Sequence, residues 1–371
     1  MSQQNTKRST QSFPFYRFSG TYRQIGQQFG EACSELIIKH RDYAMDRLNS
    51  RYHMTAEKLE SAVMKYRPYV QKYAEFFDEE VQGVAEGAGI SIAEAYLLQV
   101  RAEINHDAKA NNECTTFAIL AEATSNGIPL IGQNCDLPAF YSELGVVVEC
   151  VPDRGPATLM LTPAGQISYV GINQRGLGAF ANFLTCDGWR AGLPRYMLSR
   201  LALSKDTVGE AVELIRQVER ASSRNLILLD KYGGAVDFEN TPTRDALIFP
   251  ENGLLAHSNH YTAESLQAEE RLRGVELENS RIRLERMLSL LKEHHGKLNT
   301  TVMQDILRDR ETFPHCLCQV IGDERVQSPG DKGADIITFA SVIAEPGEGN
   351  LWVALGPPNQ YEYKRYTFSQ G

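Results

Sequence analysis

The sequence has no surplus of positive charge and no long apolar run. Its 38 Lys and Arg residues stand against 47 Asp and Glu residues, so the formal net charge is −9. A nucleic-acid backbone repels such a chain unless a basic patch intervenes, and the sequence shows none. No segment approaches the run of about 20 apolar residues that spans a bilayer. We therefore expect neither nucleic acid nor membrane as a partner.

A secretory signal and a cysteine-pair motif are also missing. Residues 1–14 are polar and lack the apolar core of a secretory signal. The 7 cysteines are an odd number without a C-x-x-C pair, which is typical of free thiols in a reducing compartment. His257 and His260 have no acidic residue among them and no metal-motif spacing. These absences predict a cytoplasmic protein without a metal.

The first third of the chain shows a helical pattern. Apolar residues recur at helical spacing, as in Ile25–Leu36. Ser91 and Glu94 have the form of a capping box, which opens a helix through Leu98. Residues 106–113 contain no large apolar side chain and are predicted to form an exposed connection.

From Cys114 onward, short apolar runs alternate with turn residues, which is typical of strands. Asn126–Gly127 predicts a two-residue hairpin between the first two runs. Residues 264–295 are predicted to form a long helical region with Leu284, Leu288 and Leu291 on its inward side. Strands are predicted at 116–120, 129–133, 146–151, 158–161, 167–172, 177–183, 226–229, 235–238, 337–343 and 351–355, and further helices at 194–203 and 208–220. This order predicts one α+β domain in which helices cover sheets.

Several short motifs occur in a fixed order along the chain. They are Ser19–Thr21 with Gly26 and Gly30, Gly83–Gly89, Cys114–Phe117, Gln133–Asp136, Gly171–Leu177 and Ser258–His260. In this order and spacing the chain resembles the isopenicillin-N acyltransferase family, also described as acyl-CoA:6-aminopenicillanic-acid acyltransferases. Bile-salt hydrolases and penicillin V acylases are more distant relatives of that family. The resemblance runs from Phe15 to Pro357.

The resemblance implies a four-layer αββα sandwich of the N-terminal-nucleophile (Ntn) hydrolase type. It implies a precursor that cuts itself between Glu113 and Cys114, giving a helical segment (1–113) and a catalytic segment (114–371) that stay associated in one structural domain. The implied activity is hydrolysis or acyl transfer on a small-molecule amide, without a cofactor. Participation of an acyl-CoA and a higher oligomer are left open.

The chemistry explains why a cut would precede activity. A thiol with a pKa of about 8.5 is mostly protonated at neutral pH and needs a base. Once Cys114 begins a chain, its α-amino group, with a pKa of about 7.7–8.0, supplies that base on the same residue. As an amide, the same nitrogen is not basic. The cut would be an attack of the Cys114 thiol on the Glu113 carbonyl, followed by hydrolysis of the thioester.

Further site residues are implied by the resemblance. The side chain of Asn225 and the backbone N–H of Asn182 would stabilise the oxyanion, Asp136 would hold the α-ammonium group or orient Cys114, and Arg281 would lower the thiol pKa. The remaining candidates, for substrate positioning or processing, are Thr115, Asn134, Asn259 and His260. From the residues alone, turn caps and a solvated helix arginine are the plainer interpretations.

Asp136 raises a geometric question. With a two-residue hairpin at Asn126–Gly127, position 136 pairs with Phe117, on the opposite face from Cys114. The Asp136 assignment therefore predicts a bulge or a longer loop in the hairpin.

Two positions depart from the family pattern. Glu113 stands where a small residue is usual, which predicts slow or condition-dependent cleavage, and Cys135 replaces an aromatic residue, which predicts a reshaped substrate pocket. Two other hypotheses stay open. One is an uncleaved small-molecule binding protein, and the other is a conventional Cys–His hydrolase that uses Cys114 or Cys186 with His260.

Overall fold

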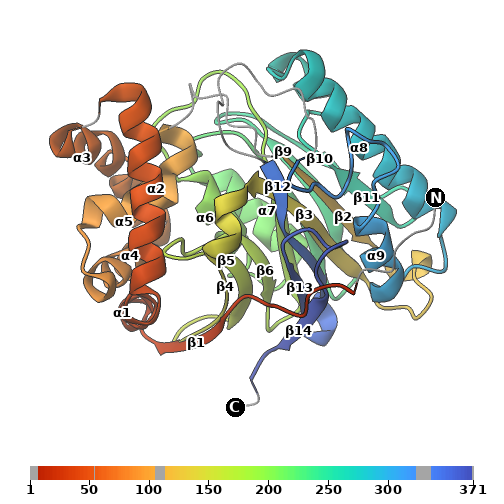
Figure 1. The fold of residues 1–371 in the computed structure, drawn as a ribbon, viewed down its shortest axis with the longest axis horizontal. Helices are drawn as coiled ribbons and strands as arrows, with labels where there is room; N and C mark the ends of the chain where they lie inside the picture. Colours follow the sequence, from red (N-terminus) through yellow and green to blue (C-terminus); the bar gives the residue numbers. More distant parts are fainter. Residues whose placement is uncertain (1–6, 54, 105–112, 323–335, 370–371) are drawn as a thin grey trace.

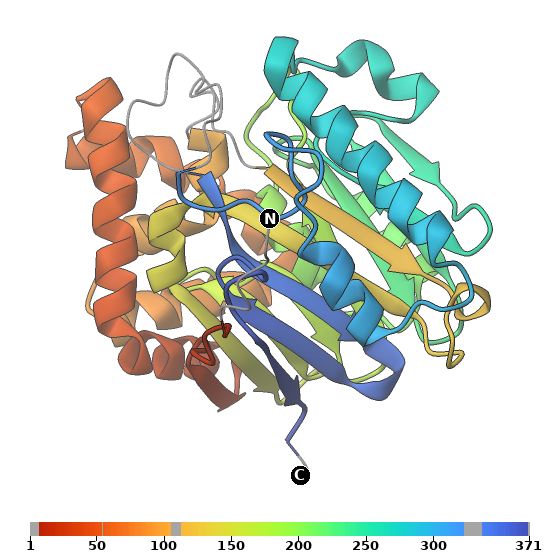
Figure 2. The ribbon, with the colours of Figure 1, turned by 45° about the vertical axis from the view of Figure 1, so that its right-hand side comes forward.

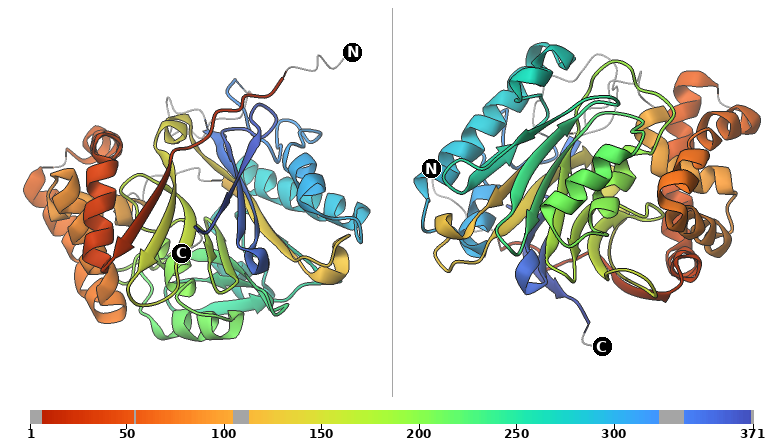
Figure 3. Two further views of the ribbon diagram at one scale, coloured as in Figure 1. Left: turned by 90° about the horizontal axis from the view of Figure 1, so that it is seen from below. Right: turned by 180° about the vertical axis from the view of Figure 1, so that it is seen from behind.

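The structure is a computed structural model that describes residues 7–53, 55–104, 113–322 and 336–369 (Figure 1). Two sheets lie face to face, and helices cover the outer face of each (Figures 1 and 3). This is the αββα arrangement expected from the sequence. No helix among the described residues combines the length and the apolar character that crossing a bilayer requires.

The larger sheet has the strand order β1-β4-β5-β6-β7-β8-β9-β10 among the described residues. Its β1 runs parallel to β4, and the other described pairs are antiparallel. The bounds are β1 Phe15–Gly20, β4 Gly145–Pro152, β5 Thr158–Pro163, β6 Val170–Asn173, β7 Leu177–Asn182, β8 Arg224–Asp230, β9 Ala235–Asn240 and β10 Asp245–Ile248. Because β1 joins the sheet beside β4, the segment before Glu113 contributes to the same sheet as the segment after it.

The smaller sheet is antiparallel, with the order β11-β2-β3-β12-β13-β14. Its bounds are β2 Glu113–Ile119, β3 Leu130–Pro138, β11 Leu254–His257, β12 Ile336–Glu345, β13 Asn350–Leu355 and β14 Tyr363–Thr367.

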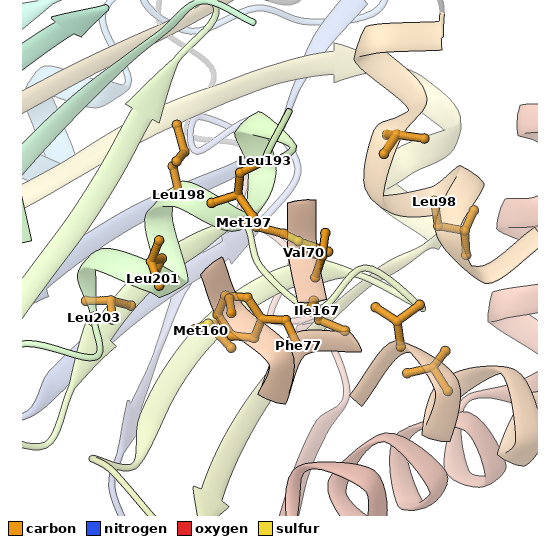
Figure 4. Close-up of a cluster of buried hydrophobic side chains, with 14 of the residues drawn as sticks. Val70, Phe77, Leu98, Met160, Ile167, Leu193, Met197, Leu198, Leu201 and Leu203 are labelled. Atoms are coloured by element: carbon orange, nitrogen blue, oxygen red, sulfur yellow. The ribbon is translucent and has the colours of Figure 1, made fainter. Parts of the chain in front are cut away.

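Two helical layers cover the sheets. The large sheet is covered by α1 Tyr22–Ala32, α2 Ser34–Tyr52, α3 Ala56–Met64, α4 Arg67–Ala88, α5 Ile92–Ile104, α6 Arg195–Ala202 and α7 Val208–Gln217, and the small sheet by α8 Gly274–Glu293 and α9 Thr300–Leu307 (Figure 2). Short 3₁₀ helices are η1 Ala121–Ala123, η2 Ala139–Glu143, η3 Glu264–Glu269 and η4 Pro346–Glu348. Figure 4 shows part of the core beneath the first layer, where Phe77 of α4 and Met197 of α6 lie near Met160 of β5.

Glycines let α1 and α4 pack with their backbones close together. A Cβ atom on Gly26 would lie 2.1 Å from the Glu80 carbonyl oxygen, and one on Gly83 would lie 2.2 Å from the Arg23 carbonyl oxygen. No side chain fits at these distances. The glycine motifs seen in the sequence therefore fix how the first helical layer is assembled.

Several predicted elements are confirmed, among them the capping box of α5, in which Ser91 N donates to Glu94 Oε2 (2.8 Å) and Glu94 N to Ser91 Oγ (3.2 Å). The predicted two-residue hairpin is wrong. Ile119 pairs with Leu130, so residues 120–129 connect β2 to β3 and include η1. The predicted exposed connection at 106–113 lies outside the described residues, apart from Glu113 at the start of β2.

The long helical region predicted at 264–295 is divided into η3 and α8. Of the predicted inward residues, Leu291 is fully buried as expected, but Leu284 and Leu288 are half-buried, and Arg283 and Met287 are fully buried in their place. Because position 283 is polar, a search for apolar residues at helical spacing does not assign it to the buried face of the helix.

Candidate active site around Cys114

Cys114 is the second residue of β2 and lies opposite Cys135 of β3. Cross-strand partners share a face of the sheet, and Cys135 belongs to the apolar cluster between the two sheets. Gln133, two residues along the same face, accepts a hydrogen bond from Ala181 N of β7 (2.9 Å). The Cys114 side chain, only 4% exposed, therefore projects into the space between the sheets.

Side chains from three other parts of the fold hold the backbone of Cys114. Its N–H donates to Oδ1 of Asn259, which follows β11, at 2.9 Å. Its carbonyl oxygen accepts from Nδ2 of Asn182 at the end of β7 (2.9 Å) and from Nη1 of Arg283 in α8 (2.8 Å). All three side chains are buried. The strand end is thus held by directional bonds on both of its main-chain polar groups.

Arg283 links these groups into one network. Nη1 also donates to Thr115 Oγ1 (2.8 Å), and Nη2 donates to Asn259 Oδ1 (2.8 Å). Nε donates to Asn279 Oδ1, one helical turn earlier (3.3 Å). Every described acceptor is a neutral oxygen, so the buried guanidinium brings a positive charge to the Cys114 neighbourhood.

A serine positions α8 against the turn that follows β11. Ser258 Oγ donates to the carbonyl oxygen of Ser280 (2.6 Å), and Asn259 N donates to Ser280 Oγ (2.7 Å). Nδ1 of His260 also lies 2.8 Å from Ser280 Oγ. Because Ser280 and Arg283 are three residues apart on one helix, they share a face. The same contact that docks α8 therefore aims Arg283 at Cys114.

The environment keeps the Cys114 thiol protonated in the intact chain. Burial, together with the carboxylate of Asp136, raises the pKa of Cys114 to about 12. A hydrogen bond from the Asp136 backbone and the charges of Arg283 and Arg224 act in the opposite direction. The thiol therefore requires a local base or a change in its surroundings before it can act as a nucleophile near neutral pH.

Asp136 lies in β3 opposite Glu113, and its Oδ1 accepts from Thr338 Oγ1 (2.6 Å). The Asp136 side chain lies on the face of the sheet opposite to the Cys114 side chain, as the two-residue hairpin also predicts. The predicted irregularity in the β2–β3 hairpin is wrong, since this pairing is continuous. The register shift lies instead in β12, between Thr338 and Ala340. Asp136 thus lies next to Cys114 along the sheet, in a regular β2–β3 ladder.

The other predicted residues are divided between this network and its surroundings. Thr115 and Asn259 are part of it, and Asn182 enters through its side chain. Asn134 donates to the carbonyl oxygens of Leu307 (2.9 Å) and Leu317 (2.8 Å), so its described contacts join the sheet to α9 and the loop beyond it.

Arg281 and Asn225 have no described hydrogen bond to Cys114. Arg281 is exposed on α8, two residues before the buried Arg283. Asn225 lies opposite Asn182 in β8, and its Nδ2 donates to Asp237 Oδ1. Cys186 packs in a separate apolar cluster with Tyr261 and Leu266. His260 contacts Ser280, as given above, and its ring stacks on that of His257 with the centroids 6.5 Å apart.

A buried acidic network lies behind Asn225. His257 Nε2 lies 2.8 Å from Glu239 Oε1 and 3.9 Å from Asp237 Oδ2. Although burial opposes its charge, Asp237 and Glu239 raise the pKa of His257 to about 9. Burial raises the pKa of Asp237 to about 7. Among the described residues these three are the one group with potential metal-ligand atoms within 4.8 Å of one another, and here His257 and Glu239 bond each other.

Arg283, Asp237 and Glu239 lie at this site but are not predicted from the sequence. Helical periodicity could have placed Arg283 beside Asn279, one turn away. No local signal brings Asp237 and Glu239 to His257, because the two strands belong to different sheets.

Known proteins resemble this chain in sequence and in fold. Residues 123–359 match the family described as acyl-coenzyme A:6-aminopenicillanic acid acyl-transferase. The 40 kDa form of acyl-coenzyme A:6-aminopenicillanic-acid-acyltransferase from Emericella nidulans is 28% identical over 344 residues, 92% of each chain.

Two solved structures are similar at low sequence identity. A variant of conjugated bile acid hydrolase from Clostridium perfringens is 15% identical, with a TM-score of 0.49 over 69% of this chain and 97% of its own. Penicillin V acylase from Agrobacterium tumefaciens is 13% identical, with a TM-score of 0.45 over 65% of this chain and 83% of its own. The family match covers more than half of the sequence, and the chain belongs to the acyl-coenzyme A:6-aminopenicillanic acid acyl-transferase family.

Proposed function

We propose that the chain cuts itself between Glu113 and Cys114 and then hydrolyses, or transfers the acyl group of, a small-molecule amide through an acyl-Cys114 intermediate. One observation carries the proposal. The Cys114 nitrogen donates to a buried side-chain oxygen, Oδ1 of Asn259, at 2.9 Å. If the preceding bond is cut, this nitrogen becomes an α-amino group that is already held beside its own thiol.

The cut is an intramolecular acyl transfer. The Cys114 sulfur attacks the Glu113 carbonyl carbon, and the C–N bond breaks as the nitrogen takes up a proton. Water then hydrolyses the resulting thioester, which releases the Glu113 carboxylate and the free thiol. The α-amino base does not exist before the cut, so in this step the thiol proton passes to the departing nitrogen, and the charges of Arg283 and Arg224 favour the thiolate.

In the cleaved enzyme the α-amino group accepts the thiol proton, and the sulfur attacks the substrate amide. The α-ammonium group then protonates the departing amine, and water or a second amine releases the acyl group. An acyl-CoA is a second candidate acyl donor, by analogy with the substrate named for the relative from Emericella nidulans.

Asn182 and Arg283 support the reacting residue. Both donate to the Cys114 carbonyl oxygen, and they fix the strand end so that sulfur and nitrogen keep one orientation. The positive charge of Arg283 also favours the thiolate. Asn225 remains the candidate oxyanion donor, because its Nδ2 donates to Asp237 Oδ1 and keeps a second N–H, whereas Nδ2 of Asn182 donates to the carbonyl oxygens of both Cys114 and His257. Asp136 remains the candidate to orient the α-ammonium group.

Packing supports continued association of the two fragments. Strand β1 pairs with β4 over six residue pairs, from Phe15↔Val147 to Gly20↔Pro152, and α1–α5 share one apolar core with the strands of the large sheet. A cut between Glu113 and Cys114, at the start of β2, leaves these contacts intact.

The test compares purified wild-type protein with Cys114→Ala on a denaturing gel, with N-terminal sequencing of each band. We expect two wild-type bands, one beginning at Cys114, and a single band for Cys114→Ala. Cys135→Ala is the matched control, because Cys135 is the buried cysteine directly opposite in β3. It should still be cut.

Two outcomes would contradict the proposal in different ways. Amide turnover without a chain that begins at Cys114 would favour a conventional Cys–His hydrolase. A single intact band at every age and pH, without turnover, would favour a binding protein. Intact-mass measurement after incubation with amides detects the cut and the acyl-enzyme together.

A further inference from the structure

A second thiol lies directly opposite the candidate nucleophile. Cys135 of β3 is the cross-strand partner of Cys114, and both side chains lie on the face of the small sheet that points between the sheets. Both are free thiols, and both are buried. The proposed function uses Cys114 and assigns no role to Cys135.

The backbone around Cys114 shows which kind of cross-strand pair the two cysteines form. In a hydrogen-bonded antiparallel pair, the two residues exchange both of their main-chain bonds. The Cys114 N–H instead donates to Asn259 Oδ1, on the side of β2 away from β3. Cys114 and Cys135 are therefore a non-hydrogen-bonded pair, which is the narrower kind.

This narrow spacing suits a disulfide. The Cα atoms of a non-hydrogen-bonded pair lie about 4.5 Å apart, and disulfides join residues whose Cα atoms are about 4.4–6.8 Å apart. The two side chains also leave the sheet on the same face. A bond between the Cys114 and Cys135 sulfurs is thus compatible with the strand pairing that the structure already has.

A polar side chain holds the Cys135 sulfur. Nε2 of Gln133 donates to Cys135 Sγ at 2.9 Å, and Oε1 of Gln133 accepts from Ala181 N of β7 at 2.9 Å. The amide is therefore fixed at both ends. An apolar residue at position 135 would fill the same space but would not accept this hydrogen bond, so packing alone does not account for a thiol here.

The two thiols also affect each other's protonation. Burial raises the pKa of Cys135 well above its usual value, and negative charge on Cys114 raises it further. The hydrogen bond from Gln133 acts in the opposite direction. Conversion of Cys114 to an uncharged form removes the second of these causes, so it makes the Cys135 thiolate easier to form.

We infer that Cys135 is a resolving thiol, which forms a disulfide with Cys114 after a hydroperoxide has oxidised Cys114. The inference rests on the proposed function for the reactivity of Cys114, and it adds a modification site and a reversible inactivation of the enzyme. In the cleaved chain the α-amino group takes up the Cys114 proton, so the thiolate that attacks the peroxide forms after the cut.

The chemistry has two steps. The Cys114 sulfur attacks one peroxide oxygen, the O–O bond breaks, and the other oxygen leaves with a proton as water or an alcohol, so Cys114 becomes a sulfenic acid. The Cys135 sulfur then attacks the Cys114 sulfur, the S–O bond breaks, and hydroxide leaves with the Cys135 proton as water. The two thiols together lose two electrons, which the peroxide gains.

The first test detects the bond itself. Cleaved wild-type protein is treated with hydrogen peroxide, its remaining thiols are blocked with N-ethylmaleimide during unfolding, and it is digested after glutamate. Cuts after Glu122 and Glu143 separate residues 114–122 from residues 123–143, and each peptide holds one cysteine. We expect mass spectrometry to find these two peptides linked, and dithiothreitol to separate them. Absence of the linked pair would overturn the inference.

The second test asks whether the bond protects the nucleophile. We expect peroxide to lower amide turnover of the wild type by about 10-fold or more, and dithiothreitol to restore most of it. In Cys135→Ala and Cys135→Ser the sulfenic acid meets no resolving thiol and proceeds to sulfinic acid, which dithiothreitol does not reduce. Each protein is compared with its own untreated activity.

Cys186→Ala is the matched control for these variants. Cys186 is also buried, but it packs in a separate apolar cluster with Tyr261 and Leu266. Its variant should lose and regain activity as the wild type does. Equal recovery in the wild type and in both Cys135 variants would contradict the role of Cys135, and the Ser variant shows that the thiol, rather than the volume of the side chain, is responsible.

Failure of this inference is distinguishable from failure of the proposed function. A protein that is cut before Cys114 and turns over amides, but yields no linked peptides, would leave the proposed function standing and remove the disulfide. If no amide is turned over, the linked peptides are still measurable. Their presence supports the modification site, and their absence contradicts it.

Discussion

The space between the two sheets has a polar end and an apolar end. Along β7 the inward residues change from Phe180 to Asn182, and along β8 they change from Asn225 to Ile227 and Leu229. On β9, Asp237 and Glu239 continue the polar end, and Cys114 begins it on β2. The same strands therefore carry packing at one end and chemistry at the other.

The two ends obey different physical requirements. The apolar end is held by burial, which is not directional and tolerates changes of shape better than changes of volume. At the polar end every donor needs an acceptor in place, because an unpaired buried polar group is costly. Asn182 Oδ1, Asn225 Oδ1 and Asp237 Oδ2 have no hydrogen-bond partner among the described residues. Stability supplied by the apolar end is what allows the polar end to keep such groups.

The largest effect on activity is expected for Arg283→Met, a substitution at the polar end. We expect cleavage and amide turnover to fall by about 10²- to 10³-fold, because the Cys114 carbonyl and Asn259 lose a donor. The free energy of unfolding should fall by about 1 kcal/mol, since the described acceptors of Arg283 are neutral and no carboxylate is left unpaired. Rates of cleavage by gel densitometry and urea unfolding measure the two effects.

Arg281→Met is the matched control for this change. It removes an exposed arginine from the same helix, two residues away, and should alter turnover by less than about 3-fold, the size usual for a surface change. A larger loss for Arg281→Met than for Arg283→Met would restore Arg281 as the arginine of the site and would contradict the placement of Arg283.

A substitution at the apolar end should lower the stability of the protein and leave its specific activity unchanged. Leu161 of β5 is fully buried in the cluster between the sheets, and Leu161→Ala should lower the free energy of unfolding by about 2–3 kcal/mol. The specific activity of the folded fraction should stay near that of wild type, because Leu161 belongs to the apolar end. Urea unfolding followed by active-site titration separates the two quantities. A loss of specific activity without a loss of stability would show that the ends are coupled.

The sequence was sufficient to predict the apolar end and the layers. Alternating runs such as 158–161 predict β5, and the ordered motifs predict the αββα arrangement that the structure shows. Those signals are local or rest on family resemblance. The predicted bounds and buried face of a helix were less accurate where a polar residue occupies a buried position. In α8 the buried Arg283 took a position that a search for apolar stripes assigns to solvent.

The polar end was harder to predict because its contacts join distant segments. Arg283 and Cys114 are 169 residues apart, and Asn259 and Cys114 are 145 apart. The resemblance pointed to Asn259 and to Asn182, although with the backbone of Asn182 rather than its side chain. It gave no indication of Asp237 or Glu239, whose relation to His257 follows from the packing of β9 against β11. Only the three-dimensional arrangement combines these side chains.

The smallest expected effect is a pH dependence confined to the polar end. The pKa of His257, about 6.5 when unfolded, is raised to about 9 in the folded chain, so its stabilising contribution is complete below about pH 6.5 and is lost as the pH rises through 9. Asp237, whose pKa burial raises to about 7, acts in the same direction, because the folded state binds the proton more tightly than the unfolded state. We expect the free energy of unfolding to fall as the pH rises from 6.5 to 9.5, and His257→Gln to flatten that slope. Leu161→Ala should instead lower the whole curve evenly. Parallel curves for wild type and His257→Gln would show that the polar end does not titrate in this range.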